Sequence, residues 1–154
     1  MFVIRRAAKR DIFQVRKLLN EAGLNDRGVD KHLEHFFVVE SPGENGSAAR
    51  ITGAVGMEVY RPCGLLRSFV LERASWNPKV GLQLIQILLA YAGHLQLSHV
   101  YLLAGASASF FEQIGFAEVP FADLPEDISG SEHLEHTGPN GTPMVYACFP
   151  SGQH

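Results

Sequence analysis

The sequence predicts a mixed α+β fold, in which one sheet is covered by helices on both faces. Three observations support this class. Segments with strand-like and helix-like patterns alternate along the chain. A turn-rich connection at residues 42–46 joins two early strand segments, which indicates a hairpin. A long uncharged helical segment lies between the strands predicted at 65–71 and 99–103, as expected for a crossover connection within one sheet.

The first half of the chain is predicted to be rich in strands. Residues 11–22 place apolar side chains at helical spacing before Gly23 ends the helix. The strand at 50–60 contains Gly53 and Gly56, as expected where a strand bends or another backbone comes close. A turn at residues 62–64 is expected to lead into the next strand. The predicted elements are strands at 2–7, 36–40, 50–60 and 65–71, and helices at 11–22 and 29–35.

The segment 80–95 is predicted to be a buried helix. Its apolar residues cover most of the helix surface and leave a narrow polar stripe at Gln83, Gln86 and His94, so we expect it to be covered on more than one side. A length of about 17 residues and these polar side chains argue against a membrane span. Ser107 is expected to cap a helix that runs through Gln113. The remaining expectations are strands at 99–103, 116–119 and 144–149 and a helical turn at 123–128.

Composition indicates one globular domain over residues 1–154, with 46% hydrophobic and 19% charged residues. A formal charge of −3 argues against a nucleic-acid partner and favours a small-molecule substrate. Cys63 and Cys148 form no C-x-x-C pair, and the first residues do not have the order of a signal peptide, so we expect a cytoplasmic protein. Whether the two cysteines meet in space is left open.

The tetrapeptide His-Leu-Glu-His occurs at residues 32–35 and again at 133–136. Two histidines three residues apart on a helix could share one metal ion. Neither copy has a cysteine or aspartate at ligand spacing, so the sequence predicts no metal site and histidines on solvated helix faces.

Residues 66–116 resemble the cofactor-binding half of the GNAT superfamily of N-acetyltransferases. Residues 65–71, Leu-Leu-Arg-Ser-Phe-Val-Leu, are similar to the family's fourth strand, and residues 107–116, which end in Ile-Gly-Phe, resemble its fourth helix and following turn. The resemblance is best for a subgroup of small amino-acid-type acetyltransferases, some linked to arsenic-resistance operons. It implies the GNAT fold, with a central mixed sheet of about seven strands, and acetyl-CoA as cosubstrate.

In the GNAT fold the fourth and fifth strands splay apart, and the pantetheine arm of acetyl-CoA lies in the gap. The resemblance implies that Phe69, Val70 and Leu71 offer main-chain hydrogen bonds to pantetheine, and that an N–H near Phe69 polarises the thioester carbonyl. We therefore expect a V-shaped opening between strands 65–71 and 99–103. A pocket should lie there, with room made by Gly53, Gly56 and Gly115.

Two further residues of the fourth strand, Arg67 and Ser68, would lie at the mouth of the acceptor site. The Arg67 guanidinium could hold a substrate carboxylate, and a structural salt bridge is the equal alternative. Phe111 stands where many family members have a tyrosine that protonates the leaving thiolate. The amino-acid-type subgroup shares this phenylalanine, so the thiolate is expected to take its proton from solvent.

The loop that should bind pyrophosphate departs from the family pattern. Residues 76–81, Trp-Asn-Pro-Lys-Val-Gly, stand where the family has (Gln/Arg)-x-x-Gly-x-(Gly/Ala), and only the last glycine fits. Trp76 replaces a polar residue, Pro78 has no N–H, and Lys79 brings a Cβ to a glycine position, although its ammonium could pair with phosphate. The candidate cofactor-binding residues here are Asn77, Lys79, Val80, Gly81 and Leu82.

Glu58 is the first candidate for the general base that removes a proton from the amine. It follows Gly56 and Met57 on the third strand, where the resembling subgroup also carries an acidic residue. An exposed strand carboxylate is the alternative interpretation, and His99 is a weaker candidate base.

The sequence thus supports three functional hypotheses. The first is an N-acetyltransferase that moves acetyl from acetyl-CoA to the amine of a small, amino-acid-like acceptor. The second is a GNAT-fold binding or regulatory protein that has lost catalysis. The third is a structural dimer subunit that uses the apolar surface of the helix at 80–95. The acceptor and the oligomeric state, including a homodimer, are left open.

Overall fold

The computed structural model describes residues 2–43, 45–75, 77–137 and 141–149. Contacts divide the chain into two compact units. The first comprises Met1–Met57 and Ser68–Leu88, and the second Glu58–Arg67 and Leu89–His154. The single domain expected over residues 1–154 stays a prediction.

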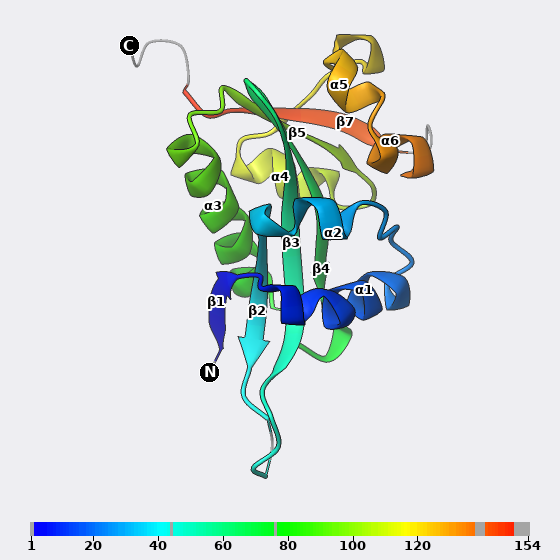
Figure 1. Ribbon diagram of the computed structural model, residues 1–154. Coiled ribbons are helices and arrows are strands. Elements are labelled where there is room, and N and C mark those ends of the chain that lie inside the picture. The colour runs from blue at the N-terminus through cyan, green and yellow to red at the C-terminus, as the bar shows by residue number, and fades with distance from the viewer. Residues whose placement is uncertain (1, 44, 76, 138–140, 150–154) are drawn as a thin grey trace. The chain divides into compact units, whose positions relative to one another are not determined.

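The strands form one mixed sheet, as the sequence predicts (Figure 1). Its seven strands have the order β1-β2-β3-β4-β5-β7-β6. The pairs β1–β2, β2–β3, β5–β7 and β6–β7 are antiparallel, and β4–β5 is parallel. The bounds are β1 Val3–Arg6, β2 Phe36–Ser41, β3 Arg50–Tyr60, β4 Cys63–Leu71, β5 His99–Ala104, β6 Ala117–Glu118 and β7 Thr142–Ala147.

In the first unit, helix α1 (Ile12–Glu21) packs on the sheet through the apolar positions that its helical spacing aligns. Val15 and Leu19 are completely buried there, beside Phe36 and Val38 of β2. This confirms the helix predicted from the sequence pattern. The other helical segments that begin in this unit are η1 Lys9–Asp11, α2 Val29–His32, η2 Leu33–His35, η3 Arg73–Ser75 and α3 Pro78–His94.

The strand glycines of this unit make room for core side chains. A Cβ built on Gly56 would lie 2.2 Å from Cζ of Phe36, and one on Gly53 would lie 2.6 Å from Cδ2 of Leu71. Both distances are shorter than any real contact, so these positions accept only glycine unless the neighbouring side chains move. The expectation that Gly53 and Gly56 clear space for a ligand pocket is therefore wrong.

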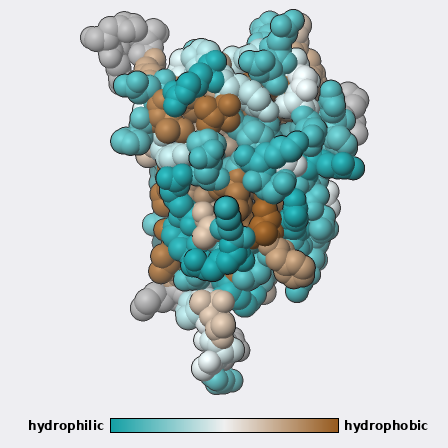
Figure 2. All heavy atoms as spheres, in the orientation of Figure 1, coloured by the Kyte–Doolittle hydropathy of each residue, from teal (hydrophilic) through white to brown (hydrophobic). Residues whose placement is uncertain are grey.

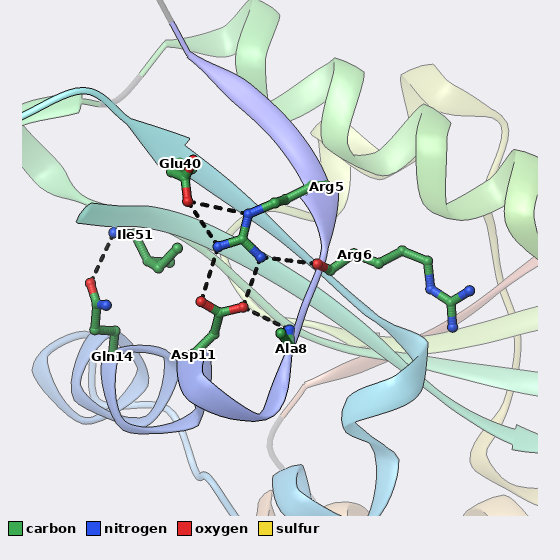
Figure 3. Close-up of polar contacts among 7 residues, drawn as sticks. All are labelled: Arg5, Arg6, Ala8, Asp11, Gln14, Glu40 and Ile51. Atoms are coloured by element: carbon green, nitrogen blue, oxygen red, sulfur yellow. Dashed lines mark hydrogen bonds and ion pairs between the residues drawn. The ribbon is translucent and has the colours of Figure 1, made fainter. Parts of the chain in front are cut away.

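A network of ion pairs around the buried Asp11 joins η1 to β1 and β2 (Figure 3). Asp11 is only 2% exposed, and its two oxygens accept hydrogen bonds from the Arg5 guanidinium at 2.8 and 3.0 Å. Asp11 also accepts the Ala8 N–H at 2.7 Å, and Arg5 extends to Glu40 on β2. The hydrogen bonds from Arg5 lower the pKa of Asp11, although burial opposes this effect.

Helix α3 is buried along one side only, contrary to the expectation that it is covered on more than one. Leu84, Ile85 and Leu88 are fully buried, whereas Leu82 is 37% exposed. Exposed residues also include Gln83, Gln86, Ala90 and His94. Pro78 begins the helix, a position at which the missing N–H costs nothing. In the part of the chain that the structure describes, no helix has the length and hydropathy of a membrane span.

On the face shown in Figure 2, hydrophobic residues form separate patches within a largely hydrophilic surface. The most exposed large apolar side chain among the described residues is Phe13 on α1, at 76%. Single exposed apolar side chains are normal on the surface of folded proteins. They give no evidence of a dimer interface, and the homodimer stays a prediction.

The second unit is built around the antiparallel pair β5–β7, which is in register from His99↔Ala147 to Ala104↔Thr142. An apolar cluster on this part of the sheet joins Leu65 of β4 to Ile128 and Leu134 of the helices that precede β7. The helical segments here are α4 Ala108–Ile114, η4 Phe121–Asp123, α5 Glu126–Ser129 and α6 Glu132–Thr137.

Two local expectations for the second unit are wrong. Cys63 and Gly64 belong to β4, so the turn before this strand lies at residues 61 and 62. Ser107 is the N-cap residue of α4 but makes no side-chain capping bond.

Gly115, which has a φ of +125°, ends α4, and a Cβ there would lie 3.2 Å from the Tyr146 ring. Gly115 therefore serves the end of the helix rather than a pocket.

We predict that the Arg5–Asp11 pair stabilises the fold at neutral pH and fails in acid. Because the pKa of Asp11 is lowered on folding, its contribution is complete above the ordinary value near 3.8 and is lost as pH falls through the folded value. Asp11→Asn should therefore lower the free energy of unfolding by about 1.5 to 3 kcal/mol at neutral pH and reduce its acid dependence. Urea unfolding measured across this pH range tests this.

The matched control is Asp30→Asn, because Asp30 also faces an arginine, Arg16, but its side chain is 60% exposed. Exposed pairs contribute little, so this variant should unfold like the wild type. Equal effects of the two substitutions would contradict the role given to Asp11.

Candidate functional site

The parallel pairing between β4 and β5 is short. The parallel ladder comprises Cys63↔His99, Gly64↔Val100 and Leu65↔Tyr101 and goes no further in the described residues. Both strands continue beyond it, β4 to Leu71 and β5 to Ala104. The pairing is therefore not continuous along the two strands, and the V-shaped opening expected between them stays a prediction.

The backbone of β4 is irregular just beyond this point. Ser68 has a φ of +61°, in the left-handed region that residues other than glycine rarely adopt. Ser68 is also buried, at 7% exposure. A left-handed residue inside a strand interrupts the regular alternation of main-chain N–H and C=O groups. This irregularity immediately precedes Phe69, whose N–H is the predicted donor to a thioester carbonyl.

A buried ion pair lies in the second unit, close to the end of the β4–β5 ladder. Nη1 of Arg67 donates to Oε2 of Glu58 at 2.7 Å, and the two side chains are 0% and 2% exposed. The Tyr60 hydroxyl donates to the other carboxylate oxygen, Oε1 of Glu58. Removing one member of such a pair typically lowers the free energy of unfolding by about 3 to 5 kcal/mol, because the other charge is left buried alone. The structure thus holds a carboxylate in a fixed, dry position near the end of the β4–β5 ladder.

Two more polar side chains face this pair. Burial, followed by the hydrogen bond and the charge of Glu58, raises the pKa of Tyr60, so the phenol stays protonated. Burial, followed by the positive charge of Arg67, lowers the pKa of His133 on α6 to about 4, although the Glu58 charge opposes this shift. His133 is therefore a neutral imidazole at physiological pH.

The second His-Leu-Glu-His copy is thus not a solvated histidine face, because His133 is half-buried against the Glu58–Arg67 pair. In the first copy, the His35 side chain is only 19% exposed. Within the described ranges, no three histidine, cysteine or acidic side chains gather as a metal site would require.

The structure brings two of the predicted site residues together. Glu58, the candidate base, is buried rather than exposed, and Arg67 makes the salt bridge that was its alternative role. His99 lies at the closed end of the β4–β5 ladder, where its Nδ1 is 3.0 Å from Oγ of Ser98. No sequence pattern placed Tyr60 or His133 beside Glu58. The spacing of Glu58 and Tyr60 carries a signal, because residues i and i+2 of a strand share a face.

The candidate pantetheine residues of the first unit have side chains that face different environments. Val70 is 6% exposed and belongs to the apolar core beneath α1, whereas Phe69 and Leu71 are half-buried. A surface pocket of about 490 Å³ lies beside the end of β4, lined by Leu18, Glu21, Ala22, Val70, Leu71, Glu72 and Arg73. The cofactor pocket expected between β4 and β5 stays a prediction.

The start of α3 uses its backbone donors internally. Oδ1 of Asn77 accepts the Lys79 N–H at 2.9 Å, and the Asn77 carbonyl accepts the Gly81 N–H at 3.1 Å. Asn77 therefore acts as an N-cap for a helix whose first residue, Pro78, has no N–H. Lys79 is exposed, Val80 is buried and Leu82 is partly exposed. Trp76 lies outside the described residues.

Phe111, on α4 of the second unit, is 3% exposed and part of an aromatic row. Its ring contacts Phe110 and Phe116 edge-on, with centroids 5.3 and 5.4 Å apart, and Phe116 continues the row to Tyr146 on β7. Such edge contacts fix ring positions. A phenylalanine here has no proton to give.

Comparisons with known proteins give a consistent fold. No protein-family model and no curated protein matches the sequence. The N-acetylglutamate synthase of Neisseria gonorrhoeae, solved with coenzyme A and N-acetyl-glutamate, matches with a TM-score of 0.80 and 19% identity over 97% of this chain and 36% of its own. This chain therefore spans about a third of the synthase.

Two other solved structures match over nearly their whole length. Rv2747 of Mycobacterium tuberculosis, solved with CoA, has a TM-score of 0.75 and 20% identity over 94% of this chain and 98% of its own. A GNAT-family acetyltransferase of Staphylococcus aureus Mu50 has a TM-score of 0.73 and 15% identity over 96% and 99%. Together with the seven-stranded mixed sheet and its flanking helices, these matches establish that the chain has the GNAT acyl-CoA N-acyltransferase fold.

Proposed function

We propose that the protein is an N-acetyltransferase that moves acetyl from acetyl-CoA directly to the amine of a small, amino-acid-like acceptor. The observation that carries the proposal is the early end of the β4–β5 ladder, with a buried carboxylate bonded to Arg67 close to this end on β4. The shared fold with proteins solved with CoA supports acetyl-CoA as the cosubstrate. We further propose that the protein acts in the cytoplasm as a homodimer.

In this proposal the main chain of Phe69, Val70 and Leu71 binds pantetheine, and the Phe69 N–H polarises the thioester carbonyl. The acceptor nitrogen attacks the carbonyl carbon, and the C–S bond breaks. Glu58 receives the proton that the amine loses. Since Phe111 has no ionisable group, the CoA thiolate takes its proton from solvent.

Arg67 has a supporting role in this proposal. Its guanidinium is already bonded to Glu58 and is fully enclosed, so it holds the base in place. A direct role for Arg67 and Ser68 in binding an acceptor carboxylate requires this pair to open first. An acceptor carboxylate would then replace Glu58 as the partner of Arg67.

The second candidate function is a GNAT-fold binding or regulatory protein without turnover. The start of α3 favours this alternative, because Pro78 offers no N–H and the Lys79 N–H is bonded to Asn77. Phosphate binding at helix N-termini depends on these donors. Calorimetric titration with acetyl-CoA, followed by a thiol-release assay with a panel of amino acids and amines, separates the two functions. Binding with turnover supports the transferase, binding alone supports the alternative, and absence of both overturns the acetyl-CoA assignment.

We predict that the Lys79 ammonium is the main phosphate-binding group of the loop. Since the Lys79 N–H already has a partner, a glycine at this position would add no donor and would remove a cation. Lys79→Gly should therefore weaken acetyl-CoA binding about tenfold and flatten its dependence on ionic strength. Titrations at several salt concentrations measure both effects. Lys79→Arg, which keeps the charge, is the control, and tighter binding by Lys79→Gly would refute the role of the ammonium.

A second prediction concerns the base. Glu58→Gln should lower kcat by about 10² to 10⁴ with little change in acetyl-CoA affinity, because the substitution removes a proton acceptor and leaves the β4 backbone in place. Circular dichroism must show that the variant is folded, since Arg67 loses its counter-charge. Glu40→Gln, which also changes a strand carboxylate paired with an arginine, is the matched control. Full turnover by a folded Glu58→Gln variant would remove Glu58 from the reaction.

A further inference from the structure

The buried ion pair poses a problem of access. Glu58 and Arg67 are 2% and 0% exposed, so neither side chain meets an acceptor directly in this conformation. Both carboxylate oxygens of Glu58 already accept hydrogen bonds, one from Arg67 and one from Tyr60. Tyr60 is the member of this bonded trio that is only half-buried. Among these three side chains, Tyr60 is therefore the one best placed to meet an acceptor.

We propose that Tyr60 is a proton-relay residue of the acetyl transfer, carrying the proton of the acceptor amine to Glu58. This inference rests on the proposed function. As the amine attacks the thioester, its N–H proton passes to the Tyr60 oxygen, and the Tyr60 hydroxyl proton passes to Oε1 of Glu58. The phenol ends the step with one proton, as it began. Glu58 becomes neutral, and the proton that it has gained later returns to solvent by the same route.

The surroundings of Tyr60 suit this role. Its raised pKa keeps the phenol protonated, so its hydroxyl always has a proton to donate to Glu58. Its ring packs against the apolar cluster of Leu65, Leu124 and Leu134, which fixes the direction of the hydroxyl. The i and i+2 positions of Glu58 and Tyr60 on β3 hold donor and acceptor on one face of the strand. These constraints come from packing and remain when the acceptor binds.

Four charged or titratable groups bear on the relay. Arg67 holds Glu58 at its other oxygen, and Asp127 acts on Tyr60 from α5 by its charge. His133 faces the pair from α6 and is the rival route, since it too is half-buried. Tyr101 of β5 lines the same apolar cluster as Tyr60 and provides a matched control.

The experiment compares Tyr60→Phe, Tyr101→Phe and His133→Gln in the full chain. Tyr60→Phe should lower kcat about 10²-fold, at the lower end of the range for a lost proton-transfer group, with KM and acetyl-CoA affinity unchanged. Tyr101→Phe removes a hydroxyl from the same cluster and should leave kcat within about twofold. His133→Gln should also retain turnover.

A proton inventory separates a relay from a merely structural role. With two protons in motion, kcat in mixtures of H₂O and D₂O should curve with the deuterium fraction for the wild type and become linear in Tyr60→Phe. If the wild type turns over and Tyr60→Phe matches Tyr101→Phe, the relay is wrong and the proposed function stands. Loss of turnover in His133→Gln alone would overturn the role of Tyr60 and assign the proton transfer to His133 on α6. If the wild type neither binds acetyl-CoA nor transfers acetyl, the proposed function fails and the relay fails with it.

Discussion

The short parallel ladder between β4 and β5 is the constraint on which the candidate site depends. A parallel pair in the interior of a sheet normally continues along both strands, because each unpaired main-chain group costs free energy when buried. Here the pairing comprises three residue pairs, although both strands extend further. The left-handed Ser68 lies just beyond the end of the ladder. In the proposed function, an extended pantetheine arm runs along this part of β4.

The buried Glu58–Arg67 pair of the second unit needs an explanation other than stability. An ion pair that is almost entirely removed from water contributes little net stability, because desolvation offsets the attraction between the charges. Hydrophobic residues of similar size would fill the same space with less electrostatic cost. A buried pair of this kind, bonded to the Tyr60 hydroxyl, is therefore consistent with the chemical role proposed for Glu58. The proposed role also accounts for the enclosure of the pair, because a low local dielectric strengthens its hydrogen bonds.

The two ends of the proposed cofactor site differ in how closely they follow the family pattern. At β4, binding would use the main chain, so the identity of the side chains matters little, and Val70 is free to serve the core. At the start of α3, binding would use backbone N–H groups. There the Asn77 side chain accepts the Lys79 N–H, and Pro78 has no N–H to donate. The fold is thus preserved where it depends on strand geometry, and the phosphate-binding chemistry is changed where it depends on individual residues.

The sequence by itself determined the order of strands and helices, because apolar periodicity and turn residues act over short distances. It also determined the GNAT fold, through segments 65–71 and 107–116, and it singled out Glu58 and Arg67. Tertiary structure alone decided that these two form a buried pair, that Phe36 fills the space above Gly56, and that α6 brings His133 against Arg67. Such contacts join residues 9 to 66 positions apart, and no local pattern encodes which side chains will meet once the sheet and its helices pack.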